Sequence, residues 1–195
     1  RAELPRPTLN AKLDARPVCL IRSWVIDGYN QNPLNGERYL DRNFGDLHLD
    51  LGRCGYRVIH IPVFSNLKRS KAKAYRELCA TGAEFLISEQ FVDTCDVLES
   101  LWLAARELLL RFDGITLCGL SVSKIFLTSH WDLIFSPDLL DFNLAGLMLR
   151  KLAKRGIEID RVIYTFESNP SEKALLLAMR AHQPKATLIG FQHSA

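Results

Sequence analysis

Polar side chains that could do chemistry follow two apolar runs near the C-terminal end of the sequence, residues 162–166 and 186–191. They supply a carboxylate, two amides, an imidazole and a hydroxyl, and they belong to Glu167, Asn169, Gln192, His193 and Ser194. If both runs are parallel strands, their carboxyl ends lie at one edge of a sheet, where open α/β sheets bind ligands. A carboxylate and an imidazole at that edge suit acid–base catalysis or the binding of a polar substrate.

Three of the candidate residues surround the start of a predicted helix. Asn169 suits the N-cap position and Pro170 the first helical position, so Asn169 is either a cap or a substrate ligand. Glu172 lies in the first turn, where a carboxylate stabilises the positive end of a helix, and is otherwise a catalytic candidate. Glu167 has no capping role that Asn169 does not already fill. We therefore predict a catalytic or ligand-binding role for Glu167 and for His193, with a hydrogen-bonded loop histidine as the alternative for the latter.

A second polar group follows the apolar run 18–26 and contains Asp27, Gly28 and Asn30. The glycine allows a ligand to approach the backbone closely, which favours a substrate-binding loop. An ordinary turn, in which an Asp or Asn side chain bonds its own backbone, is the alternative. These three residues are candidates for substrate binding.

Other common chemistries have weaker patterns. The five histidines are far apart in the sequence, and none has the spacing to Cys, Asp or Glu that a metal site uses, so no metal is predicted. Residues 119–123 (GLSVS) place Ser121 where a hydrolase elbow has its nucleophile, but Ser123 replaces the second glycine. Neither a dinucleotide-binding glycine pattern nor a P-loop occurs, and no cofactor is predicted.

The composition indicates one globular domain with a mild positive charge. The 195 residues are 48% hydrophobic and 24% charged, with a net charge of +3. One core is therefore expected, and a nucleic-acid partner is not. The basic stretches 68–73 and 150–155 are predicted to be solvated helix faces. Contact with anionic lipid headgroups or phosphorylated glycans is the alternative.

Cysteine usage and hydropathy favour a cytoplasmic protein. The five cysteines show no CxxC spacing, which favours reduced thiols, and the sequence contains neither a signal-peptide pattern nor an apolar run long enough to span a membrane. The sequence begins on Arg1 and stops four residues after Phe191, within the predicted site. We therefore expect a further C-terminal portion.

Hydrophobic periodicity predicts strands that alternate with helices. The strands are 18–26, 56–64, 84–88, 161–166 and 186–191. The helices are 39–55, 68–82, 91–112, 139–156 and 171–182, with 91–112 the longest, and 116–126 is a short strand or a loop. Residues 1–16 are predicted to form an arm or linker, and residues 17–195 the domain. Trp24 and Trp102 lie in predicted elements and are expected to be packing residues. Strands apolar enough to be covered on both faces indicate a mostly parallel, Rossmann-like α/β sheet.

The polar clusters also resemble a known pattern. Residues 164–172 (YTFESNPSE) and 189–194 (IGFQHS) are similar to the Y-x-F-E-N-x-P-W-E…G-Y-Q-H-S pattern of bacterial surface-carbohydrate biosynthesis proteins. Residues 42–47 (RNFGDL) are similar to the Y-F-G-D-L segment of the same proteins. Two positions differ within the first of these patterns, because Ser168 stands in place of Asn and Ser171 in place of Trp.

That family is thought to consist of GT-B-like glycosyltransferases of capsule and lipopolysaccharide synthesis. The resemblance implies that this chain is the N-terminal, acceptor-side half of such an enzyme, with the nucleotide-sugar-binding half C-terminal to it. Its partners would be a nucleotide-sugar donor and a glycan acceptor, in the cytoplasm and with peripheral contact at the inner membrane. Glu167 or Glu172 would position or deprotonate the acceptor hydroxyl, and His193 would contact a sugar or phosphate.

Two other functions remain open from the residues alone. One is a small α/β hydrolase or phosphate-handling enzyme that uses Ser121 or Asp27. The other is a non-catalytic Rossmann-like module that binds a partner protein or a nucleotide sugar.

Overall fold

The computed structural model describes most of the predicted domain. The described residues are 16–25, 39–64, 68, 70–107, 109, 111, 113–134, 138–167 and 169–192. Several sequence predictions lie outside them: the arm except Arg16, the loop with Asp27, Gly28 and Asn30, and the terminal His193 and Ser194.

A five-stranded sheet in the order β3-β2-β1-β6-β7 forms the centre of the fold. Its strands are β1 (Val18–Val25), β2 (Arg57–Phe64), β3 (Glu84–Phe85), β6 (Ile159–Thr165) and β7 (Thr187–Phe191). Each neighbouring pair in this sheet is parallel. The predicted Rossmann-like α/β fold is therefore confirmed.

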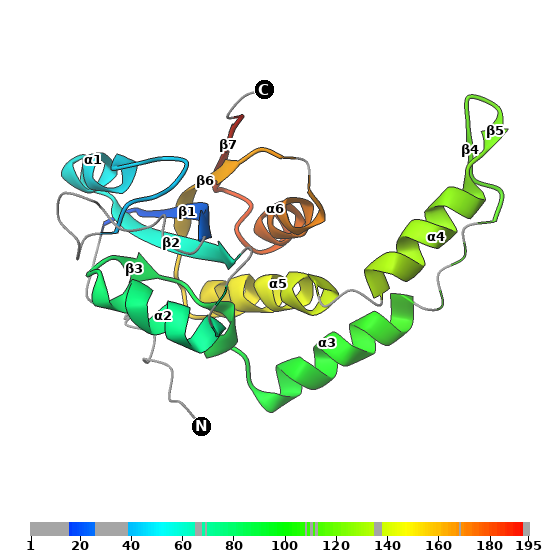
Figure 1. The fold of residues 1–195 in the computed structure, drawn as a ribbon, viewed down its shortest axis with the longest axis horizontal. Coiled ribbons are helices and arrows are strands. Elements are labelled where there is room, and N and C mark those ends of the chain that lie inside the picture. The colour runs from blue at the N-terminus through cyan, green and yellow to red at the C-terminus, as the bar shows by residue number, and fades with distance from the viewer. Residues whose placement is uncertain are drawn as a thin grey trace.

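Helices cover both faces of this sheet (Figure 1). The four covering helices are α1 (Leu47–Arg53), α2 (Lys71–Ala80), α5 (Asp138–Lys154) and α6 (Pro170–His182). Side chains alternate along β1, so Leu20 packs with Leu149 and Met179 of α5 and α6, whereas Ile21 packs with Leu47 of α1. Because α1 follows β1 on one face and α6 follows β6 on the other, the carboxyl ends of β1 and β6 mark the point where the connections change face, which is where doubly wound sheets bind ligands.

The segment between β3 and α5 extends away from the sheet (Figure 1). It contains the 3₁₀ turn η1 (Ser88–Gln90), α3 (Thr94–Glu107), the hairpin β4 (Thr116–Leu117) and β5 (Leu120–Ser121), and α4 (Ser123–Ile134). Within the described residues, none of the helices combines the length and apolar composition needed to cross a membrane.

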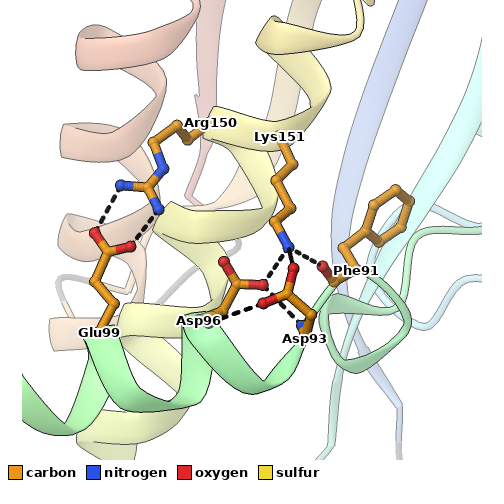
Figure 2. A network of polar contacts seen from close by, with 6 residues as sticks. All are labelled: Phe91, Asp93, Asp96, Glu99, Arg150 and Lys151. Carbon is orange, nitrogen blue, oxygen red and sulfur yellow. Dashed lines mark hydrogen bonds and ion pairs between the residues drawn. The ribbon is translucent and has the colours of Figure 1, made fainter.

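Ion pairs attach α3 to α5 (Figure 2). The Arg150 guanidinium makes two hydrogen bonds to the Glu99 carboxylate, at 2.7 and 2.5 Å. The Lys151 ammonium contacts Asp93 at 2.8 Å and also pairs with Asp96. Arg150 and Lys151 therefore bind carboxylates of the same chain, and the prediction that they lie on a solvated helix face was wrong.

The same arrangement turns the apolar side of α3 outward. Leu98 and Leu101 are exposed, and the Trp102 side chain is 58% exposed. The prediction that Trp102 is a packing residue was therefore wrong, because α3 directs its carboxylates rather than its apolar side toward α5. Trp24, by contrast, is partly buried and lines the pocket described below.

Several predicted elements have different bounds in the structure; the strand predicted at 84–88, for example, is only Glu84–Phe85. The predicted helix 39–55 begins only at Leu47, because the Asp41 carboxylate accepts the backbone N–H groups of Asn43 and Phe44 in a turn that ends on Gly45, at φ +55°. Helix α3, with 14 residues, is shorter than the 17-residue α5 and is not the longest. The stretch predicted as a short strand or loop forms the β4–β5 hairpin and the start of α4.

Candidate functional site

A pocket of about 420 Å³ lies at the carboxyl ends of β1 and β2, beside the first turn of α6. Arg22 and Trp24 of β1 line it, as do Lys71 and Tyr75 of α2 and Asn169 at the start of α6. Its volume falls within the range of small-ligand sites, and its place at the strand ends is where α/β sheets bind ligands.

Arg22 is the buried cation of this pocket. It interrupts the apolar strand β1, and it is only 3% exposed. Its guanidinium donates a hydrogen bond to Ser171 Oγ at 2.5 Å and lies 3.7 Å from Glu172 Oε1. Burial lowers the pKa of Arg22, and the nearby carboxylates of Glu172 and Glu167 partly offset that effect. Arg22 was not among the candidates selected from the sequence, and a charged residue inside an apolar strand is the signal that could have identified it.

Glu172 holds together the turn between β6 and α6. The side chain is 1% exposed, and its two oxygens accept the backbone N–H of Glu167 at 3.1 and 3.0 Å. The Asn169 amide donates a further hydrogen bond at 3.2 Å. Glu172 thus stabilises the helix start, as its position in the first turn predicts, and it also provides a counter-charge to Arg22.

Asn169 caps helix α6, as predicted. Its Oδ1 accepts the backbone N–H of Glu172 at 2.9 Å and the Ser171 hydroxyl at 2.7 Å, and Pro170 occupies the first helical turn. Asn169, Pro170 and Ser171 also line the pocket. The capping role and a ligand-binding role are therefore compatible at this residue.

Glu167 does not line the pocket, but it is hydrogen-bonded to Trp24, which forms the rim next to it. It is exposed just beyond the end of β6, and the indole N–H of Trp24 donates to Glu167 Oε1 at 3.1 Å. Because Trp24 itself lines the pocket, this hydrogen bond holds the carboxylate next to the space that a ligand would occupy. Solvent access and an aromatic neighbour are compatible with a base that acts on a bound hydroxyl.

The far wall of the pocket is aromatic and acidic. Tyr75 packs edge-on against Phe64, with ring centroids 4.7 Å apart, and its hydroxyl donates to the Glu89 carboxylate at 3.0 Å. Phe64, Tyr75 and Glu89 all line the pocket. Aromatic rings beside carboxylates and amides suit a ligand that has both apolar C–H surfaces and hydroxyl groups.

The segments that carry the family resemblance meet at this end of the sheet. Gly190 of β7 pairs with Tyr164 of β6, and a Cβ on Gly190 would lie 3.0 Å from the Tyr164 hydroxyl oxygen. Phe44, in the RNFGDL segment, packs on Phe191 with ring centroids 5.6 Å apart. Gln192 follows β7 and is exposed. The two strand ends are thus adjacent, as predicted.

A second buried polar cluster lies on the opposite face of the sheet. The Tyr39 hydroxyl contacts Ser23 at 3.0 Å and Asp41 at 3.3 Å, and the His48 and His60 rings are 5.2 Å apart. Both ring nitrogens of His60 lack a hydrogen-bond partner among the described residues. Burial, reinforced by the neighbouring His48, lowers the pKa of His60 to about 3. The two histidines are distant in sequence, and no spacing pattern indicated that they would meet.

The structure places Ser121 away from both clusters. It is an exposed residue of β5 in the two-stranded hairpin, whereas a hydrolase nucleophile elbow joins a strand of the main sheet to a helix. In the part of the chain that the structure describes, no group of three or more His, Cys, Asp or Glu side chains could hold a metal ion. No protein-family model matches the sequence, and neither does any curated protein.

Proposed function

We propose that this chain is the acceptor-side domain of a glycosyltransferase that transfers a sugar from a nucleotide-sugar donor during bacterial surface polysaccharide synthesis. The observation that carries the proposal is the strand-end pocket, in which aromatic rings, an amide, a carboxylate and two cations surround a space of about 420 Å³. Asn169, Pro170 and Ser171, which belong to one of the segments that carry the resemblance, line that pocket and support the proposal further.

The acceptor sugar occupies the pocket, with its apolar ring face against Trp24 or Tyr75 and its hydroxyls toward Asn169 and Glu89. Glu167, next to the rim, accepts the proton of the reacting hydroxyl. The hydroxyl oxygen then bonds to the anomeric carbon of the donor while the bond from that carbon to the nucleotide phosphate breaks. Glu172 is a positioning residue, because its oxygens already hold the β6–α6 turn.

The donor binds outside this pocket, on a second domain that faces the same strand ends. Gln192, His193 and Ser194 come directly after β7 in the sequence, and in this proposal His193 contacts a sugar or phosphate of the donor. This division of roles follows the two-domain arrangement that the resemblance implies.

The test is a transfer assay on the complete reading frame that contains this sequence, with a panel of nucleotide sugars and glycan acceptors. Glu167→Gln should lower kcat by about 10²- to 10⁴-fold, the usual contribution of a general base. Glu158→Gln is the matched control, because Glu158 is an exposed carboxylate next to the opposite end of β6. It should change kcat less than twofold.

Circular dichroism on each variant shows whether the fold is retained. Equal activity of Glu167→Gln and Glu158→Gln would remove the base assignment. Binding of sugars without transfer from any donor would favour the non-catalytic module instead.

A further inference from the structure

Arg22 is costly to bury, and its contacts within the chain are incomplete. A guanidinium has five N–H donors, yet only one hydrogen bond joins the Arg22 guanidinium to another described residue, the bond to Ser171. The nearest carboxylate, that of Glu172, is 3.7 Å away, which is an ion pair but not a hydrogen bond. Glu172 cannot approach without losing its bonds to Glu167 and Asn169.

The remaining Arg22 donors reach the pocket. Arg22 is among the lining residues, and none of its nitrogens belongs to the buried polar atoms that lack a partner in the described part of the chain. The unbonded donors of Arg22 are therefore not fully sealed, and the pocket is the space that the residue lines. A planar fork of N–H groups in a pocket suits a carboxylate or phosphate, which it can bind through two parallel bonds.

Among the charged side chains that line the pocket, cations outnumber anions, and the carboxylates of Glu172 and Glu167 lie near Arg22 without lining it. The charged lining residues are Arg22 and Lys71, which are cations, and Glu89, which is an anion. The Tyr75 hydroxyl donates to both oxygens of Glu89 and so spreads part of that negative charge. The first turn of α6, with its positive end, adjoins the same space.

We propose that the sugar bound in this pocket carries a carboxylate or a phosphate, and that Arg22 and Lys71 bind this group. The aromatic wall takes the ring, so the ligand class is a uronic acid or a sugar phosphate rather than a neutral sugar. That this sugar is the acceptor of a transfer reaction rests on the proposed function. The preference of the pocket for an anionic ligand does not rest on it.

Calorimetry on this chain with three ligands of one ring tests the preference: glucose, glucuronic acid and glucose 1-phosphate. We expect at least one anionic ligand to bind tenfold or more tightly than glucose. This difference in affinity should become smaller as the salt concentration rises. Tighter binding of glucuronic acid assigns a carboxylate, and tighter binding of the phosphate ester assigns a phosphate. Equal binding of all three ligands would overturn the proposal.

Variants locate the anion. Lys71→Gln changes an exposed side chain, and Arg22→Gln combined with Glu172→Gln removes both members of the buried pair, so that neither charge is left alone. Each should reduce the preference for the anion tenfold or more, while Arg161→Gln should keep it, because Arg161 stacks on Tyr56 on the other face. An unchanged preference in Lys71→Gln and in the double variant would refute the assignment.

The two proposals can fail separately. If anionic sugars bind but the complete protein transfers no sugar, the glycosyltransferase proposal falls and the pocket assignment stands. If transfer to neutral acceptors occurs with no preference for anionic ones, the pocket assignment falls and the transferase proposal stands.

Discussion

Replacing His60 with Phe should abolish a specific part of the protein's acid sensitivity. His60 is 1% exposed, and its pKa is lowered from 6.5 to about 3 in the folded protein. Because the folded value is depressed, the unfolded chain binds a proton between these values and the folded chain does not. His60 therefore contributes stability that is complete above pH 6.5 and is lost progressively as the pH falls toward 3.

The size of the effect follows from the same two values. A pH of 5 lies about 1.5 units below the pKa of the histidine in the unfolded chain, so that histidine is protonated, whereas the one in the folded protein is still neutral. The free energy of unfolding therefore falls by about 2 kcal/mol between pH 7 and pH 5. This window avoids carboxylates such as Asp93 and Glu99, whose pKa values are lowered mainly by hydrogen bonds to Lys151 and Arg150.

Urea unfolding of wild type and His60→Phe at pH 7 and pH 5 measures the difference. Phe retains a ring among Tyr39, His48 and Phe85, whose ring centroids lie 4.6, 5.2 and 5.5 Å from that of His60. Asp41 and His48, the charged or titratable groups nearest His60, are present in both proteins. Wild type should lose about 2 kcal/mol more than the variant. Equal losses of stability in the two proteins would show that His60 is already charged in the folded state. His182→Phe, at the C-terminal end of α6, is the control and should lose as much stability between pH 7 and pH 5 as wild type does.

Four further substitutions test the packing of the site, of helix α3 and of the core. Gly190→Ala should reduce the free energy of unfolding by about 1–3 kcal/mol because its Cβ would meet the Tyr164 ring, and the cost should shrink in a Tyr164→Ala background. Glu172→Gln should reduce the free energy of unfolding by about 3 kcal/mol or more, because it leaves Arg22 buried without the Glu172 counter-charge. In an Arg22→Met background the same substitution should cost much less. Additive costs in this double-mutant cycle would contradict the coupling between the two residues. Leu101→Ala on the exposed side of α3 should reduce the free energy of unfolding by less than about 0.5 kcal/mol. Met148→Ala in the core should reduce it by about 2–5 kcal/mol. The midpoints of urea unfolding curves measure both changes.

Much of the fold could be predicted because its signals are local. Alternating apolar strands and helices indicated the parallel sheet, and β1, β2 and β6 begin and end within two residues of the predicted bounds. Asn169 and Pro170 predicted the start of α6, since a cap requires only the residues beside it. The turn at Asp41 escaped prediction, because the apolar spacing of residues 39–55 continues through a segment whose backbone is held by one carboxylate.

The sequence by itself determined that polar residues follow the ends of two neighbouring strands, and the structure confirms that these ends are adjacent. Only the tertiary structure decided what surrounds them. The cation of the pocket, Arg22, comes from a strand that precedes its partner Ser171 by 149 positions in the sequence, and Glu172 follows Ser171 directly. Periodicity shows which side chains share a face, but not which element covers that face. For the same reason the sequence could not show that α3 pairs its carboxylates with α5 and leaves Trp102 exposed.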